Sequence, residues 1–408
     1  MSYFAIRNIV TATGLALLLS GCSSLSSVGT AVGNLFVDEE ELEIRVLAPI
    51  ESKVAVNVAW QTQVGSGTGE FFSGLQPAFA DNKIFVADRQ GKVVALDPSG
   101  KELWSTRLGG SAGWFSSGSS AKLSGGLNVG AGKVFVGTED GRLVGLNTET
   151  GAVEFDTTVV GEILARPMID SGMVFVNTTA GRLFALDIAT GDEVWMHESD
   201  VPALSLRGIS TPTVTNGGVL VGTGTGKLQV NIMETGLIAW EATVTTPSGA
   251  TELERIIDVD SQPILYNGIV YVVSFNGSLA AVELRSGRVV WQREYASYRD
   301  LALVGTKLIV TTNNGNVFGL DSRNGVELWS QSSLKGRALT APSAYKGNVI
   351  VGDKYGAVHV IDINEGGLLG RALLNDSEDA KFNAPAVVAG EQIIMQNVQG
   401  KVYALTVQ

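Results

Sequence analysis

The sequence is poor in the residues that carry most enzymatic and metal chemistry. Its 408 residues contain one cysteine, Cys22, and two histidines, His197 and His359. A single cysteine excludes an internal disulfide, and two isolated histidines do not supply the ligand set of a transition-metal site. We therefore expect no catalytic residues, no metal ligands and no bound cofactor.

Basic residues are also scarce. The chain has 29 Lys and Arg against 41 Asp and Glu, which gives a formal net charge of −12. Binding to nucleic acid depends on clustered basic side chains that neutralise phosphates, so the composition argues against a nucleic-acid partner. The 50 glycines beside only 10 prolines instead indicate a turn-rich globular fold.

Only one long apolar run is present, and it lies near the start of the chain. Residues 9–19 are apolar except for Thr11, Thr13 and Gly14, and the basic Arg7 precedes them. Eleven residues are fewer than the roughly 20 that span a bilayer as a helix. The order of a positive residue, a short apolar run and small residues is typical of a secretory signal peptide.

The residues after this run suggest a role for the single cysteine. The sequence LSGC at positions 19–22 resembles the bacterial lipobox, which implies cleavage before Cys22 and acylation of its side chain. Ser23 follows, without the aspartate that retains enterobacterial-type lipoproteins at the inner membrane. We expect 1–21 to be a signal peptide, Cys22 to be lipidated at the outer membrane facing the periplasm, and 22–52 to form a flexible tether ending after an acidic run.

From residue 53 onward the chain repeats itself. Each copy places a central glycine in a short turn, with β-branched and apolar segments on both sides. The eight central glycines are 38 to 51 residues apart: Gly91, Gly141, Gly181, Gly226, Gly277, Gly315, Gly356 and Gly400. Most copies continue to a second glycine and then an aromatic residue, as in Gly191 and Trp195. A period of this length is the signature of a propeller or a similar repeat architecture.

These copies predict an all-β fold, an eight-bladed β-propeller of four-stranded antiparallel blades over residues 53–408. Six copies begin with a proline, as at Pro212, and a proline at the first position of a strand removes no ladder hydrogen bond. The eighth copy ends before its aromatic strand. The segment VAVNVAW at positions 54–60 can supply that strand, so we expect the N-terminal strand to close the ring with Trp60 in the aromatic position.

The repeat A-L-D-x-x-[ST]-G-x-x-x-W resembles that of the quinoprotein-type (PQQ-like) propellers. The dehydrogenases of that superfamily use calcium and a vicinal disulfide against their cofactor. The disulfide is excluded here because the chain has one cysteine. A lipid-anchored quinoprotein or another periplasmic propeller enzyme remains the alternative interpretation, and a polysaccharide-binding propeller is a third.

Two unusually long connections between repeats carry a closer resemblance. They are PALSLRG at 202–208 and TELERIIDVD at 251–260. Together with the lipobox and the eight repeats, they are similar to the BamB family of outer membrane assembly lipoproteins. The resemblance implies a non-catalytic scaffold of the β-barrel assembly (BAM) complex that works with other BAM lipoproteins, binds the periplasmic POTRA domains of BamA and assists unfolded outer membrane proteins.

The resemblance also assigns partner-binding residues. It places the family's contact positions on Leu204, Leu206 and Arg207 in the first connection and on Asp258 and Asp260 in the second. Both connections join consecutive repeats, so we expect them to stand side by side on one face, with an apolar spot flanked by charges. The alternative is structural: the leucines pack beneath the loop, and Arg207 pairs with Asp258.

Overall fold

The computed structural model describes residues 39–110, 119–374 and 380–408. The predicted signal peptide, Cys22 and the first part of the tether lie outside these residues. The chain divides into two compact units, 1–47 and 48–408. Within the described residues, none of the helices has the length and apolar character needed to cross a membrane.

The described part of the first unit contains one helix, α2 (Glu39–Arg45). The acidic end of the predicted tether is thus a short helix, and the role of 22–52 as a tether stays a prediction. The amide of Val46 still donates to the carbonyl of Leu42, at 3.3 Å. Arg45 lies in the last turn, where a positive charge is favourable beside the partial negative charge of the helix C-terminus.

The second unit consists of eight four-stranded antiparallel sheets, which confirms the predicted propeller. Blades 1 to 4 contain β2 (Ala78–Ala80), β3 (Lys83–Ala87), β4 (Lys92–Leu96), β5 (Glu102–Arg107); β6 (Asn128–Gly130), β7 (Lys133–Gly137), β8 (Arg142–Asn147), β9 (Val153–Thr158); β10 (Met168–Asp170), β11 (Met173–Thr178), β12 (Arg182–Asp187), β13 (Glu193–Glu198); β14 (Thr213–Thr215), β15 (Gly218–Gly222), β16 (Lys227–Ile232) and β17 (Ile238–Thr243).

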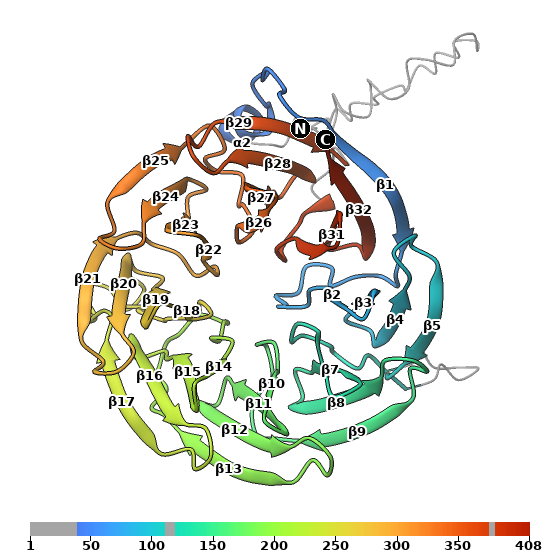
Figure 1. Cartoon of the computed structure of the whole chain (residues 1–408), viewed down its shortest axis with the longest axis vertical. Coiled ribbons are helices and arrows are strands. Elements are labelled where there is room, and N and C mark those ends of the chain that lie inside the picture. Colours follow the sequence, from blue (N-terminus) through green and yellow to red (C-terminus); the bar gives the residue numbers. More distant parts are fainter. Residues whose placement is uncertain (1–38, 111–118, 375–379) are drawn as a thin grey trace, which may run out of the picture. The chain divides into compact units, whose positions relative to one another are not determined.

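Blades 5 to 8 contain β18 (Ile264–Tyr266), β19 (Ile269–Val273), β20 (Ser278–Glu283), β21 (Val289–Glu294); β22 (Ala302–Val304), β23 (Lys307–Thr311), β24 (Val317–Asp321), β25 (Glu327–Gln331); β26 (Ser343–Tyr345), β27 (Asn348–Gly352), β28 (Ala357–Asp362), β29 (Leu368–Leu373); β30 (Val387–Ala389), β31 (Gln392–Gln396), β32 (Lys401–Val407) and β1 (Val56–Gln63). In Figure 1 the labelled first strands, such as β2, β10 and β22, lie toward the centre of the ring, and the fourth strands, such as β5, β13 and β25, lie at the rim.

The position of a strand within its blade explains its composition. The second and third strands, such as β3 and β4, are buried along nearly their whole length, because neighbouring blades cover both of their faces. They therefore read as continuous apolar runs. The fourth strand alternates between exposed and buried residues, as in β5. The hydrophobic core consists of clusters that each join two neighbouring blades; one of them combines Phe85 of blade 1 with Val134 of blade 2.

The ring closes as predicted. β1 pairs antiparallel with β32, and Trp60 lies opposite Ala404. Its indole Nε1 donates to the carbonyl of Pro98 in blade 1, at 2.9 Å. A side chain on Gly100 would lie 2.6 Å from the same indole, and Gly100 has a φ of +84°, so both the space and the backbone require glycine there.

The same contact recurs around the ring. The tryptophan of one blade donates its Nε1 to a carbonyl in the next blade at 2.8 to 3.0 Å, from Trp104, Trp195, Trp240, Trp291 and Trp329. Phe155 takes the position in blade 2, and in blade 7 the same position in the register is Gly370. The glycine and the tryptophan of the repeat are thus partners across blade boundaries, because each indole packs on the glycine of the following blade.

Candidate partner-docking site

Both predicted connections emerge on one face of the propeller, here called the inter-blade face. In an antiparallel blade, the chain leaves the fourth strand on the side where the second and third strands turn. The connections 64–77, 159–167, 199–212 and 244–263 and the turns around Arg89 and Glu139 therefore share this face. This arrangement brings together residues that are far apart in the sequence.

The connections 199–212 and 244–263 lie side by side, as predicted. Both line a small cavity of about 60 Å³. Leu206 of the first connection and Asp258 of the second are both among the residues that line it. A side chain built on Gly208 would lie 2.2 Å from Oδ2 of Asp260, so the first connection passes directly over the second.

The two leucines differ in exposure. Leu204 is 44% exposed, whereas Leu206 is half-buried against the connection beneath it. The interpretation that both leucines pack under the loop is therefore wrong for Leu204. An exposed leucine on a loop with a partly buried neighbour forms the small apolar spot that the sequence predicts.

Arg207 pairs with residues other than Asp258, the partner that the structural alternative gave it. Its Nη2 lies 3.3 Å from Oε2 of Glu162 and 3.6 Å from Oε2 of Glu139. Its Nη1 donates to the carbonyl of Phe72 at 3.4 Å. The alternative pairing with Asp258 is wrong, because that carboxylate lies in the interior while Arg207 remains 41% exposed and faces blades 1 and 2.

Glu139 connects Arg207 to a second arginine. Arg89 binds the Glu139 carboxylate with both nitrogen donors, Nε at 2.9 Å and Nη2 at 2.8 Å. The hydrogen bond from Arg89 is the main reason that the pKa of Glu139 is lowered, and the charge of Arg207 lowers it further. Arg207 is thus held by a carboxylate that Arg89 keeps ionised and oriented.

The two aspartates do not form the exposed charged rim expected from the sequence. Asp258 is 2% exposed, and its Oδ2 has no hydrogen-bond partner. Burial raises its pKa to about 6. Asp260 is half-buried, and burial together with the charges of Asp258 and Asp300 raises its pKa to about 8. Both residues lie beneath the loop, and their contribution to partner binding stays a prediction.

The residues on either side of Asp258 in the sequence indicate that it is buried. Ile256, Ile257 and Val259 surround Asp258 and are all buried. A single acidic residue within an apolar run is unusual for a solvated loop. The sequence reasoning also missed Phe71, whose role becomes visible only in the structure.

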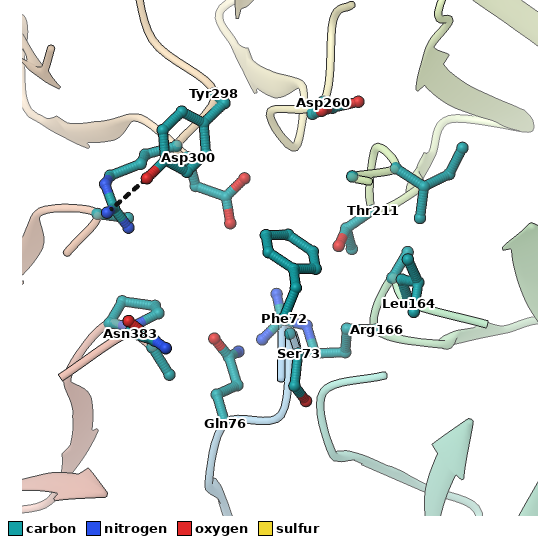
Figure 2. A pocket seen from close by; sticks show the side chains of 18 of the residues that line it. Phe72, Ser73, Gln76, Leu164, Arg166, Thr211, Asp260, Tyr298, Asp300 and Asn383 are labelled. Atoms are coloured by element: carbon teal, nitrogen blue, oxygen red, sulfur yellow. Dashed lines mark hydrogen bonds between the residues drawn. The ribbon is translucent and has the colours of Figure 1, made fainter. Parts of the chain in front are cut away.

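The centre of the inter-blade face is hollow. A cavity of about 330 Å³ opens at the mouth of the central channel, and Figure 2 shows Phe72 projecting into it. Arg299 donates from Nη2 to the Tyr298 hydroxyl at 2.8 Å, and Arg166 donates to Gln262 at 2.9 Å. Among the described residues, no group of three His, Cys, Asp or Glu side chains is placed to hold a metal ion.

Comparisons with known proteins agree on one family. The family model described as "Outer membrane protein assembly factor BamB" matches residues 52–113, 108–331 and 306–408. The protein of that name from Alteromonas naphthalenivorans is 47% identical over 401 residues, which cover 95% of this chain and 94% of the relative. The one from Escherichia coli K12 is 40% identical over 390 residues, with 95% and 96% coverage.

Solved structures share the fold. The crystal structure of BamB from Moraxella catarrhalis matches with a TM-score of 0.76 at 24% identity, over 86% of this chain and 100% of that one. A quinohemoprotein alcohol dehydrogenase from Comamonas testosteroni matches with a TM-score of 0.67 at 12% identity, over 93% and 84%. At such low identity, both likenesses concern the propeller fold alone.

Proposed function

Because the chain belongs to the BamB family of outer membrane protein assembly factors, we propose that it is a scaffold that holds the periplasmic POTRA domains of BamA. The family places the protein with the BAM machinery at the outer membrane, as an assembly factor and not as an enzyme. The alternative of a quinoprotein dehydrogenase has only a distant likeness of fold in its favour.

The N-terminal segment anchors this scaffold. Acylation of Cys22 after removal of 1–21 would fix the chain to the periplasmic side of the outer membrane, since each buried CH₂ adds about 0.8 kcal/mol of membrane affinity. Residues 22–52 would connect the anchor to the propeller. A Cys22→Ser variant is expected to move from the membrane fraction to the soluble periplasmic fraction.

The docking site is the loop that carries Leu204, Leu206 and Arg207. The observation that supports it best is the environment of Arg207, an exposed guanidinium that two carboxylates orient beside an exposed leucine. An apolar anchor next to an oriented arginine is a common core of protein–protein interfaces. Because the propeller holds the loop in place, binding requires little further ordering of the scaffold.

A pull-down with detergent-solubilised BamA tests this proposal. The tagged mature chain is compared with Leu204→Ala and Arg207→Ala, and with Leu103→Ala as a matched control, because Leu103 is a similarly exposed leucine on the rim strand β5. We expect the wild type and the control to capture BamA and the two loop variants to capture much less. Equal capture by all four proteins would remove the loop from the docking site, and failure of the wild type to capture BamA would refute the scaffold role.

The same preparation can test for other partners. Mass spectrometry of the captured material would identify other BAM lipoproteins and unfolded outer membrane proteins, which the family resemblance implies. Absorbance of the purified chain above 300 nm, or calcium in it, would instead support the dehydrogenase alternative.

A further inference from the structure

Two adjacent aromatic residues on the inter-blade face have no role in the propeller core. Phe71 and Phe72 lie in the connection 64–77, and they are 51% and 44% exposed. Phenylalanine has no polar group that favours such exposure, and clustered exposed apolar side chains on a folded protein mark interaction sites. Other exposed apolar residues on this face, Val160, Val201 and Leu253, lie on the connections near Leu204.

The connection that carries these rings is firmly held. Its backbone hydrogen bonds reach blade 8 and blade 1, from Val64 N to Gly400 O at 2.8 Å, from Thr68 N to Val398 O at 2.9 Å and from Arg89 N to Gly67 O at 3.0 Å. Beyond the rings, the Ser73 hydroxyl donates to the carbonyl of Ser124 at 3.1 Å. The rings are therefore displayed by an ordered backbone, which reduces the entropy lost when a partner covers them.

The aromatic pair is continuous with the docking loop. The carbonyl of Phe72 accepts the hydrogen bond from Arg207. The guanidinium of Arg89 lies 3.6 Å from the centre of the Phe71 ring, a cation–π contact, and the same Arg89 binds Glu139. Phe71 and Phe72 thus border the charge cluster that orients Arg207.

We propose that Phe71 and Phe72 are anchor residues of the docking surface, which extends from Leu204 across Arg207 to the channel mouth and receives one apolar surface of a BamA POTRA domain. This inference rests on the proposed function. The two arginines next to the rings are already paired, Arg89 with Glu139 and Arg207 with Glu162, so what the rings offer a partner is aromatic area. A folded domain with an exposed apolar face fits this surface better than a highly charged peptide does.

The test measures binding of full-length variants to immobilised, detergent-solubilised BamA. Phe72→Ala removes the ring but keeps the carbonyl that accepts from Arg207, and Phe71→Ala removes the ring from Arg89. Leu103→Ala is again the control. We expect each phenylalanine variant to raise the Kd by about tenfold or more and the control by less than about twofold. Thermal melting of each variant verifies that it is folded.

A second measurement needs no variant. Hydroxyl-radical labelling of the wild-type chain, with and without BamA, is expected to show protection of Phe71 and Phe72 and none of Leu103. Unchanged labelling, or near-wild-type Kd values for both phenylalanine variants while Leu204→Ala weakens binding, would overturn this inference and leave the proposed function standing. The inference would also be overturned if the two phenylalanine variants lost only the binding of an unfolded barrel protein and bound BamA normally. If Leu204→Ala and Arg207→Ala also bind normally, the proposed docking site fails together with this inference.

Discussion

The buried Asp258 gives a sharp prediction about stability and pH. Its carboxyl group has an ordinary pKa of 3.8, which burial raises to about 6 in the folded chain. The folded state therefore binds this proton more tightly than the unfolded state does. Stability from this group is fully present below pH 3.8, and it is lost as the pH rises toward 6, because the unfolded chain ionises first.

The size of the effect follows from the two values. At about 1.4 kcal/mol for each pH unit between 3.8 and about 6, ionised Asp258 costs about 3 kcal/mol of unfolding free energy above pH 6. Asp258→Asn removes the titration. Asparagine has nearly the same shape as aspartate, and any cost of its buried amide is the same at every pH.

The assay is urea unfolding of the wild type and Asp258→Asn at pH 4 and pH 8. We expect the variant to gain about 2 kcal/mol relative to the wild type between these pH values, because part of the cost is already present at pH 4. Asp192→Asn, at an exposed position outside the strands, is the matched control for the substitution of an aspartate by asparagine. A difference between variant and wild type that stays constant with pH would refute the assigned pKa.

Three further predictions concern packing and the charge cluster. Trp60→Ala should lower the unfolding free energy by about 3 kcal/mol in urea titrations, because it removes the contact that closes the ring; a loss below about 1 kcal/mol would contradict that role. Gly236→Ala should lower it by about 2 kcal/mol, since Gly236 has a φ of +71° and a side chain there would lie 2.5 Å from Trp195; an unchanged melting temperature would show that the boundary can relax. Glu139→Gln should lower the unfolding free energy by about 2 kcal/mol and weaken BamA capture, because Arg89 and Arg207 lose the negative charge that they both contact. Normal capture would mean that Glu139 does not orient Arg207.

Much of the fold can be predicted from the sequence because the sequence itself repeats with the period of the blades. The glycine period gives the number of blades, and the missing final strand identifies 54–60 as its replacement. The tryptophan and glycine positions follow the same period, although the sequence does not reveal that they meet across a blade boundary. The helix α2 was missed because seven residues are too few for a periodic apolar pattern.

The site is less predictable because its contacts depend on the curvature of the ring. The position of the two connections on one face follows from strand order alone. The partners of Arg207 do not, since Glu139 and Glu162 lie 68 and 45 residues away and many carboxylates are closer in the sequence. The exposure of Phe72 is likewise set by the path of one connection over the channel, which no local pattern specifies.

The pairing of β1 with β32 also has a consequence for the order in which the molecule assembles. β1 precedes all the other strands of the propeller and β32 follows them, so the ring remains open until the end of the chain has been delivered. During that interval β1 has no partner strand, and an unpaired strand edge invites pairing with other chains. Such a long-range final step makes folding slow and leaves the open ring as a natural target for chaperones and proteases in the compartment where the chain folds.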